Sequence, residues 1–372
     1  MTHPSQVLKI AVVGCSCRAA VACLRRSGIE ALAADQFADA DLRELAPATQ
    51  LARYPDDIPD WLAATDATHW MYVGGLENHP EIVAAAAEIR PLLGVPSPAL
   101  PAIRDPLLLQ ETLRSAGFLF PETSLLPPHA GHWLIKPRRS AGGLQIRSFQ
   151  HPTADEEVVY QRLLTGRSCG AAFAAINAQA QFLGASRQLF GRKWGAPQPF
   201  QYAGSIGPIS LSPSHADALQ SLADHLVAST ELRGLFGVDF LQHGDQLWPL
   251  EINPRFTAAM ELLPVDVMRR HLAAWLPEYD LDDESFDTRC PRGKLFVYAP
   301  CDFVWTERMA GAVRRALNEL LLDLADIPLP NTPIPQSAPI LTLLAAGSDV
   351  GGIAAQLRRG ARKVRELAAA AN

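Results

Sequence analysis

The first hundred residues alternate short apolar runs with segments whose apolar positions recur at helical spacing. Residues 8–14, Leu-Lys-Ile-Ala-Val-Val-Gly, have the pattern of a buried strand that ends in glycine, and residues 18–27 follow as a helix. Two further strands are predicted at 29–34 and 69–75, and a helix is predicted at 80–90. Strands that alternate with helices indicate an α/β arrangement, in which ligands bind at the carboxyl ends of the strands.

The middle of the chain carries a predicted hairpin with polar residues inside it. Val238 to Gln242 and Leu247 to Ile252 have the pattern of two short apolar strands, and the Gly-Asp pair between them favours a tight turn. Residues 214–232 predict a long amphipathic helix with a serine N-cap before the hairpin. After residue 264, the pattern predicts two strands and a final helix, at 294–299, 339–345 and 350–371.

The polar residues of this hairpin are typical of a metal site. Asp239 lies on the first strand, whereas Glu251 and Asn253 lie two apart on the second, so the period of a strand aims the last two side chains to one face. Three oxygen-bearing side chains can therefore converge, and hard cations such as Mg²⁺ prefer oxygen ligands that they share with substrate phosphates. Pro254 ends the strand, and Arg255 follows with a guanidinium suited to bidentate phosphate contact. The hairpin therefore predicts a site for a metal and a nucleotide.

A second cationic element precedes the hairpin. Residues 132–137 predict a strand that carries Lys136 near its end, and a loop of small residues with Gly142 and Gly143 follows. A lysine supplies a compact positive charge, and glycines allow backbone N–H groups to approach phosphate oxygens. The loop is not a Walker A motif, since no Gly-Lys-Ser/Thr follows, and the Gly-x-Gly-x-x-Gly fingerprint of dinucleotide folds is absent from the sequence.

Composition limits the classes of function that remain. A chain of 372 residues predicts about two to three domains, and 48% hydrophobic with 19% charged residues is typical of a soluble globular protein. No apolar run is long enough to span a bilayer and no leader is evident, so we expect a cytoplasmic protein without a membrane segment. The net charge of −6 argues against a nucleic-acid partner, and six scattered cysteines without a CxxC pair predict reduced structural thiols.

The hairpin sequence resembles the metal-binding hairpin of the ATP-grasp superfamily. It reads Gly-Val-Asp-Phe and then Glu-Ile-Asn-Pro-Arg, with Glu251 twelve positions after Asp239. Members of that superfamily activate a carboxylate as an acyl phosphate and pass it to a nucleophile. The resemblance implies ATP and Mg²⁺ (or Mn²⁺) as cofactors, with the metal held by Asp239, Glu251 and Asn253 and the transferring phosphate steadied by Arg255. It also implies small-molecule carboxylate and amine substrates, and it allows a homodimer.

Other segments extend the resemblance but depart from it at single positions. Residues 104–123 resemble the helix that begins the ATP-grasp domain, with Pro106 where a nucleotide-contacting lysine is common. Arg104 is a candidate to replace that cation, and weaker nucleotide binding is the alternative. Residues 136–146 resemble the element Lys-Pro-x-x-x-x-Gly-Gly-x-Gly-Ile, with Gln145 in place of the last glycine.

Residues 156–166 resemble the hinge whose backbone pairs with the adenine edge of ATP. Gln161 stands where many relatives have a glutamate, so the partner of the ribose hydroxyls stays open. The resemblance implies that Lys136 joins Arg255 as a catalytic cation. The residues that it assigns to ATP binding are Lys136, Gly142, Gly143, Val159, Tyr160, Gln161, Arg162 and Leu163.

The resemblance covers roughly residues 1–350 and predicts an α/β (α+β) fold, in which an ATP-grasp fold follows a small N-terminal α/β domain. Four domains are expected in the order of the chain: a pre-ATP-grasp domain, an N-terminal ATP-grasp subdomain with the nucleotide lid, a C-terminal subdomain with the metal hairpin, and an appended α/β segment. Their predicted bounds are 1–100, 101–165, 166–275 and 276–372.

The function that these observations predict is an ATP-dependent carboxylate-amine ligase, with a thiol as the alternative acceptor. The tail of the chain resembles carboxylase-related ATP-grasp ligases of methanogens and methylotrophs, which implies a step in the biosynthesis of a methanofuran- or methanopterin-type cofactor of one-carbon metabolism. Two rival functions remain. One is a biotin-carboxylase-like enzyme that activates bicarbonate, and the other is a non-catalytic nucleotide-binding protein, motivated by Pro106, Gln145 and Gln161.

Overall fold

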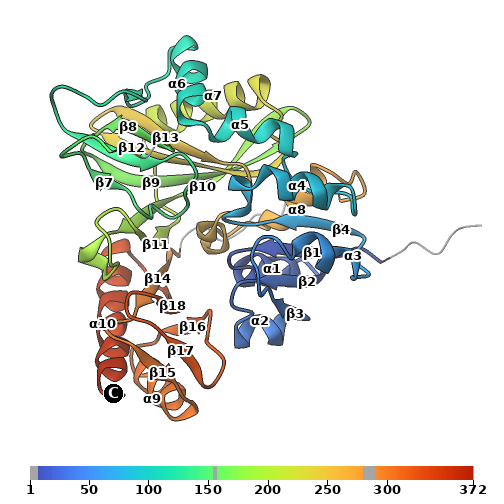
Figure 1. Ribbon diagram of the computed structural model, residues 1–372, viewed down its shortest axis with the longest axis vertical. Coiled ribbons are helices and arrows are strands. Elements are labelled where there is room, and N and C mark those ends of the chain that lie inside the picture. Colours follow the sequence, from blue (N-terminus) through green and yellow to red (C-terminus); the bar gives the residue numbers. More distant parts are fainter. Residues whose placement is uncertain (1–6, 154–156, 280–289, 372) are drawn as a thin grey trace, which may run out of the picture.

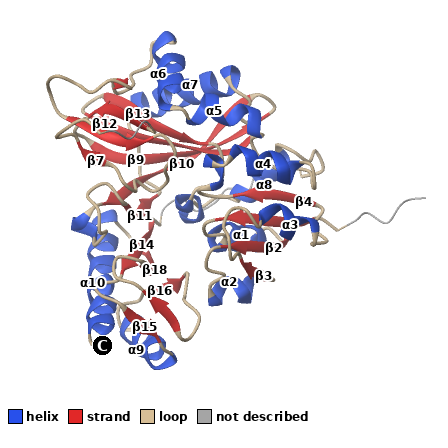
Figure 2. Cartoon of the chain, in the orientation of Figure 1, coloured by secondary structure: helices blue, strands red, loops and turns tan. Residues whose placement is uncertain are grey.

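The computed structural model describes residues 7–153, 157–279 and 290–371, which form an α/β fold with one parallel and several antiparallel sheets (Figure 1). Helices cover these sheets in each part of the molecule (Figure 2). The predicted α/β class is therefore confirmed. Glu156 at the start of the predicted hinge lies outside the described residues, as do residues 1–6, 280–289 and 372 of the predicted terminal domains. Among the described residues, no helix is long and apolar enough to cross a membrane.

The N-terminal domain is built on a four-stranded parallel sheet in the order β3-β2-β1-β4. Its strands are β1 (Lys9–Gly14), β2 (Glu30–Asp35), β3 (Ala48–Gln50) and β4 (His69–Tyr72). Its helices are α1 (Arg18–Arg26), α2 (Ala40–Leu45), α3 (Ile58–Ala63) and α4 (Pro80–Ala87), with the 3-10 turn η1 (Leu76–Asn78) after β4. The predicted strands and helices are confirmed to within a few residues. The sequence did not predict β3, because this strand has only three residues and two of them are exposed.

A second sheet, here called the lid sheet, is antiparallel and has the order β5-β8-β6-β7. Its strands are β5 (Thr123–Ser124), β6 (Trp133–Pro137), β7 (Arg147–Ser148) and β8 (Val158–Arg162). The elements that lead into it are η2 (Ser97–Ala99), α5 (Leu100–Arg104) and α6 (Pro106–Ser115). The Asp105 carboxylate accepts the N–H of Leu107 at 2.8 Å, which confirms the predicted N-cap of α6.

The largest sheet, here called the main sheet, has eight antiparallel strands in the order β13-β12-β9-β10-β11-β14-β18-β16. Its strands are β9 (Arg167–Ile176), β10 (Gln179–Phe190), β11 (Tyr202–Gly207), β12 (Gly234–His243), β13 (Gln246–Asn253), β14 (Arg292–Tyr298), β16 (Asp323–Ala325) and β18 (Pro339–Ala346). In Figure 1 the strands β11, β14 and β18 lead from the upper part of the molecule into its lower, C-terminal part. The C-terminal strands thus continue the sheet that carries the hairpin.

The remaining elements flank the main sheet. They are η3 (Arg192–Trp194), α7 (Pro213–Ser229), η4 (Ala258–Leu262), α8 (Val267–Ala273), β15 (Phe303–Trp305), α9 (Glu307–Asn318), β17 (Thr332–Ile334) and α10 (Val350–Ala369). The helix α7 contacts β10 and β9, and α10 contacts β14 and β18. The predicted amphipathic helix, the hairpin, both C-terminal strands and the final helix are confirmed as α7, β12–β13, β14, β18 and α10.

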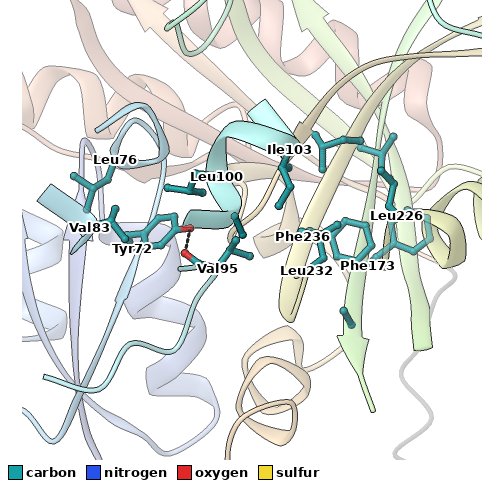
Figure 3. Close-up of a cluster of buried hydrophobic side chains, with 14 of the residues drawn as sticks. Tyr72, Leu76, Val83, Val95, Leu100, Ile103, Phe173, Leu226, Leu232 and Phe236 are labelled. Atoms are coloured by element: carbon teal, nitrogen blue, oxygen red, sulfur yellow. Dashed lines mark hydrogen bonds between the residues drawn. The ribbon is translucent and has the colours of Figure 1, made fainter. Parts of the chain in front are cut away.

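One hydrophobic core joins the N-terminal domain to the main sheet (Figure 3). Its members are fully or nearly fully buried and include Tyr72, Leu76 and Val83 from the N-terminal domain, Leu100 and Ile103 from α5, and Phe173 and Phe236 from the main sheet. The Tyr72 hydroxyl donates to the Val95 carbonyl at 2.9 Å, and the rings of Phe173 and Phe236 stack with their centroids 5.2 Å apart. Because apolar burial is continuous across α5, the N-terminal domain is held in a fixed position beside the hairpin.

A buried ionic cluster ties the N-terminal domain to the C-terminal strands. Arg18 at the start of α1 donates from both Nη atoms to the Glu261 carboxylate, at 2.6 and 2.9 Å, and its Nε donates to Asp326 at 3.1 Å. Lys294 of β14 donates to the same Glu261 carboxylate. Burial alone would raise the pKa of Glu261, but Lys294 and Arg18 outweigh it and lower that pKa to about 2.

The acid stability of the protein should depend on Glu261. Because its pKa falls from the usual 4.5 to about 2 on folding, the ionised carboxylate contributes stability that is complete above about pH 4.5 and is lost as the pH falls towards 2. We expect Glu261→Gln to destabilise the protein by about 3–5 kcal/mol at pH 7, because the buried Lys294 loses its ionised partner and the buried Arg18 keeps only its contacts with Asp326 and Asp41. Its stability should then vary less than that of the unmodified protein between pH 4.5 and 3.

Denaturant unfolding at pH 7, 4 and 3 would measure both effects. Glu307→Gln is a matched control, since Glu307 is an exposed residue in the first turn of α9. Equal losses of stability on acidification in the Glu261 variant and in the unmodified protein would contradict the role given to this carboxylate.

Candidate active site

The hairpin β12–β13 brings together the three side chains that the sequence predicted as metal ligands. Asp239 and Glu251 are direct partners across the two strands, and Asn253 faces Gly237 two positions further along. Partners in an antiparallel pair project from the same face of the sheet, so the two carboxylates are adjacent. The Asn253 amide nitrogen lies 3.4 Å from Asp239 Oδ2 and 3.5 Å from Glu251 Oε1. The strand register therefore gathers four side-chain oxygens and one amide on one face of the hairpin.

A glutamine that the sequence did not single out orients the first carboxylate. Gln188 of β10 donates from Nε2 to Asp239 Oδ1 at 2.8 Å, and its own Oε1 accepts the Ser168 hydroxyl at 2.7 Å. The hydroxyl fixes the amide so that its N–H₂ group faces the carboxylate. Gln188 is uncharged and lies two strands before Asp239 in the sequence. The sequence pattern therefore does not mark it as a site residue.

The electrostatics of the pair fit a cation between the two carboxylates. Burial and the neighbouring Glu251 hold the pKa of Asp239 well above its usual range. Burial would also raise the pKa of Glu251, but Arg104 and Lys136 outweigh it and lower that pKa. Two adjacent, half-buried carboxylates resist ionising together unless a positive charge compensates them. The Asp239 and Glu251 oxygens, joined by the carbonyl oxygen of Asn253, therefore form a donor set that suits Mg²⁺.

The donor set is small for a metal held by protein alone. Among the described residues, no group of three His, Cys, Asp or Glu side chains has an arrangement that could hold a metal ion. Two carboxylates and one amide fit a cation that takes its other ligands from water and from substrate phosphates, as Mg²⁺ commonly does.

Lys136 lies on β6 of the lid sheet and acts on the hairpin across the gap between the two sheets. Burial lowers its pKa, whereas the nearby Glu251 and Asp239 raise it. Its Nζ donates to Gln161 Oε1 at 3.0 Å, and Gln161 Nε2 donates to the Thr123 hydroxyl at 3.1 Å. The buried Gln161 therefore positions the lysine from within the lid sheet.

The segment predicted to contact adenine is the strand β8 and the residue after it. Val159 to Arg162 pair with β6, and Gln161 and Tyr160 also pair with β5. The Arg162 N–H donates to the Glu122 carbonyl and the Leu163 N–H to the His132 carbonyl, at 2.8 and 2.9 Å. These two amides are already occupied, so an adenine contact from Arg162 or Leu163 would have to use a carbonyl.

The glycine-rich loop, residues 138–146, folds against the segment before β11. Gly142 and Gly143 adopt φ values of +64° and +71°, and a Cβ on Gly143 would lie 2.1 Å from the Phe200 carbonyl oxygen. The Tyr202 N–H donates to the Gly142 carbonyl at 2.8 Å. Gln145 has a φ of +61°, which explains why the related element carries glycine at that position. The substitution changes the residue type there while the backbone keeps the left-handed conformation.

Arg104, at the end of α5, lies between the lid sheet and the hairpin. Its Nη1 donates to the Ile252 carbonyl at 2.9 Å and its Nη2 to the Ser140 carbonyl at 3.2 Å. Its charge, with those of Lys136 and Arg255, lowers the pKa of Glu251. Pro106 occupies the first position of α6, two residues further on, and has no charge to offer. Arg104 is therefore well situated for the cationic role that the sequence analysis considered for it.

Arg255 is held by a residue of the N-terminal domain. Its Nη2 bonds Glu77 Oε1 at 2.6 Å and Asn253 Oδ1 at 3.1 Å. Glu77 lies in the turn η1, its side chain is fully buried, and Arg255 lowers its pKa against the effect of burial. Glu77 has no role in the sequence-based prediction, although a polar residue shortly after a strand and two glycines is a signal for a ligand site at the carboxyl edge of a parallel sheet.

Three buried polar atoms around this centre make no hydrogen bond within the described residues. They are Glu77 Oε2, Arg104 Nε and Arg255 Nε. Buried polar atoms are almost always paired in folded proteins, so a group of unpaired ones indicates where a polar ligand completes the structure. Two of the three are guanidinium donors, which fits an anionic group such as a phosphate.

Comparison with known proteins agrees with this geometry. Residues 103–259 match the family model described as an ATP-grasp domain. No protein with a curated function matches the sequence. The matched residues contain α6, the lid sheet, the glycine-rich loop and the hairpin, and therefore all the residues to which the sequence analysis assigned a role in binding ATP or metal.

Solved structures with the same fold extend over nearly the whole chain. The N5-carboxyaminoimidazole ribonucleotide synthetase from Thermotoga maritima has a TM-score of 0.68 at 13% identity, over 96% of this chain and 98% of that one. The L-amino acid ligase from Bacillus licheniformis has a TM-score of 0.70 at 12% identity, over 96% and 97% of the two chains. The biotin carboxylase domain dimer of the Hydrogenobacter thermophilus 2-oxoglutarate carboxylase, in complex with MgADP, ADP and bicarbonate, has a TM-score of 0.66 at 12% identity, over 92% and 87%.

At these identities the structural similarity shows the fold alone. The family model adds that residues 103–259 are similar in sequence to an ATP-grasp domain. These solved structures are of a synthetase, a ligase and a carboxylase domain, and they show that this chain has the same fold. The match of residues 103–259 to the ATP-grasp family model agrees with the predicted family for this central part of the chain, and the solved structures show that the fold is shared over almost the whole chain.

Proposed function

We propose that the protein is an ATP- and Mg²⁺-dependent ligase that activates a carboxylate as an acyl phosphate and joins it to an amine. The observation that carries this proposal is the convergence of one acidic pair and three cations from four parts of the chain. Asp239 and Glu251 come from the hairpin, Lys136 from the lid sheet, Arg104 from α5, and Arg255 from the residue pair after the hairpin. This combination suits the triphosphate of ATP and the phosphoryl group in transfer.

Each residue has a role that follows from its position. Asp239, Glu251 and Asn253 would hold Mg²⁺ or Mn²⁺, which when bound supplies positive charge to the phosphate oxygens. Lys136, Arg104 and Arg255 would bind the remaining phosphate oxygens and offset the charge that moves during transfer. Gly142 and Gly143, with the other predicted ATP-binding residues, would cover the nucleotide from the lid side.

The chemistry requires no covalent intermediate with the protein. A carboxylate oxygen of the acid attacks the γ-phosphorus of ATP, the bond to the β,γ-bridging oxygen breaks, and ADP leaves. The amine nitrogen then attacks the carbonyl carbon of the acyl phosphate, inorganic phosphate leaves with its bridging oxygen, and the amine proton passes to solvent. Lys136, Arg104 and Arg255 contribute by holding the reacting groups in line.

The acceptor or acid would bind at the carboxyl edge of the N-terminal sheet. A cavity of about 510 Å³ lies there, lined by residues that include Gln36, Gln50 and Tyr54, and its volume suits a small organic substrate. The Tyr54 hydroxyl reaches to the neighbourhood of Cys15 and Gly75, in the turn that also contains Glu77. Substrate in this cavity would thus lie next to the turn that holds Arg255.

We propose cofactor biosynthesis for one-carbon metabolism as the setting, for example the addition of an amino acid such as glutamate to a methanofuran- or methanopterin-type precursor. The support for this setting is the resemblance of the tail of the chain to carboxylase-related ATP-grasp ligases of methanogens and methylotrophs. We place the reaction in the cytoplasm with small-molecule substrates. A homodimer is compatible with the proposal, since one relative of the same fold is a domain dimer.

Release of ADP from purified protein with ATP and Mg²⁺ tests the proposal. The mixtures should contain amino acids, including glutamate, small carboxylates and precursors of the two cofactor types, each with and without bicarbonate. We expect release that needs one particular acid together with one particular amine. Dependence on bicarbonate would instead establish the carboxylase alternative. Nucleotide binding without release in any mixture would overturn the assignment as an enzyme.

The acidic pair should be needed for turnover but not for folding. We expect Asp239→Asn and Glu251→Gln each to lower the rate of ADP release by at least about 100-fold, because the donor set for the metal is broken. Thermal unfolding of Asp239→Asn without metal should occur at the same or a higher temperature, since the variant removes a buried carboxyl that resists ionisation. Asp245→Asn, in the exposed turn of the same hairpin, is the matched control. Normal turnover in the Asp239 variant would remove the metal assignment.

The contact between Glu77 and Arg255 should matter for the rate. We expect Glu77→Gln to lower kcat about 10- to 100-fold, because the guanidinium loses the ionic partner that fixes its direction. The affinity for ATP should change less, since Lys136 and Arg104 still hold the nucleotide. Steady-state kinetics would measure both quantities, with Glu81→Gln on the exposed start of α4 as control. An unchanged kcat in a folded Glu77 variant would show that Arg255 needs no help from the N-terminal domain.

A further inference from the structure

A second cavity, of about 250 Å³, lies where the β10–β11 loop (residues 191–201) meets the C-terminal part of the chain. Two arginines line it, Arg192 from η3 and Arg365 from α10, and no acidic side chain does. Its other walls include the apolar surfaces of Pro197, Pro300 and Tyr298. None of these residues belongs to the candidate active site, so the function proposed above leaves this cavity without an occupant.

Among the residues that the structure describes, the two guanidinium groups have no anionic partner. Within the part of the chain that the structure describes, neither Arg192 nor Arg365 makes an ion pair or a side-chain hydrogen bond to another residue. Arg362, one turn before Arg365 on the same helix, differs because its Nε lies 3.9 Å from Glu366. Two like charges that face one cavity repel each other. An anion bound between them would attract both, so that the total electrostatic energy becomes favourable.

Arg365 lies close to the backbone of the β10–β11 loop. Gly195 has a φ of +86°, and a Cβ at this residue would lie 3.2 Å from Arg365 Nη1. The guanidinium therefore lies over bare backbone that any other residue type would crowd. Arg358, two turns earlier on α10, stacks on the Trp194 ring at 3.9 Å from its centroid. The helix α10 thus lies against the loop at two points, Trp194 and Gly195, and Arg365 stands at the cavity.

We propose that this cavity is a binding site for the anionic group, phosphate or carboxylate, of a small molecule. Two guanidinium groups supply the paired donors that such groups prefer, and Ser337 at the rim adds a hydroxyl. The volume is below the range of sites for whole drug-sized ligands, so it suits a small anion or the charged end of a larger molecule. The proline and tyrosine surfaces provide an apolar wall for the carbon skeleton next to that charge.

The cavity is also connected to the nucleotide-binding elements through the chain. The β10–β11 loop that carries Arg192 continues to Gln198, whose side chain accepts the Gln145 N–H of the glycine-rich loop at 2.9 Å. Tyr202 follows and donates to the Gly142 carbonyl. An anion that ties Arg192 to α10 therefore restrains the segment on which the glycine-rich loop rests.

Binding of inorganic phosphate and of malonate to the full-length protein tests the proposal. Isothermal titration and thermal unfolding would be carried out at constant ionic strength set with chloride, and with the candidate active site filled by Mg²⁺ and a non-hydrolysable ATP analogue, so that phosphate bound there does not contribute. We expect saturable binding of at least one of the two anions, weakened at least tenfold by Arg192→Gln or Arg365→Gln and lost in the double variant. Arg362→Gln, on the same helix but outside the cavity, should bind as the unmodified protein does.

Two further variants separate this site from the active site and from effects on folding. Lys136→Met should keep the binding of the anion, because its lysine lies in the nucleotide site. Arg365→Lys keeps a positive charge and should bind with intermediate affinity. Preference for phosphate or for malonate would assign the anionic group to one class. Binding that survives the double arginine variant, or that disappears in Lys136→Met, would overturn the proposal, as would the absence of saturable binding of either anion.

Discussion

Two half-buried carboxylates placed side by side on the β12–β13 hairpin are the constraint around which this molecule is arranged. Direct pairing of Asp239 with Glu251 in the antiparallel register keeps the two side chains together, and their partial burial limits the water that can solvate their charge. Cationic side chains from neighbouring elements lie near the pair and partly offset its negative charge. The hairpin itself carries no positive charge that neutralises the two carboxylates. This uncompensated negative charge is the physical reason to expect a metal there.

The cations belong to elements that are far apart in the sequence. The rest of the architecture brings these elements to the hairpin. Lys136 requires the lid sheet, Arg104 requires α5, and Arg255 requires the Glu77 turn of the N-terminal domain. The shared hydrophobic core around α5 keeps these elements in place (Figure 3). Packed interiors transmit displacements. A loss of packing at this junction would therefore move the cations away from the carboxylates of the hairpin.

Much of the site could be predicted because its strongest signals are local. Asp239, Glu251, Asn253 and Arg255 lie within one hairpin, where strand periodicity and turn chemistry decide the geometry without reference to the rest of the chain. The same holds for the helix start at Asp105 and for the strand that carries Lys136. The family resemblance then added roles to residues whose local structure was already clear.

What the sequence could not provide are contacts between distant segments. Glu77 meets Arg255 across 178 positions, and Gln188 meets Asp239 across 51. Periodicity has no information about such pairs. Gln161 shows the opposite limit, because a residue considered for the nucleotide proves to bond Lys136 and Thr123 inside its own sheet. Its neighbours Arg162 and Leu163 have amides that are occupied by the chain, which only the pairing of β8 with its neighbours reveals.

The continuity of the main sheet decides how far the protein can be shortened. The family match ends at residue 259, yet β11 is paired on one side with β14, which begins at Arg292. A fragment cut near the end of the match would leave the backbone N–H and C=O groups of β11 open along one edge. Open edges recruit strands from other copies of a chain, and this is a common route to aggregation. The C-terminal strands thus cover an edge that the matched residues alone would leave open, and we expect a fragment that stays dispersed in solution to include them.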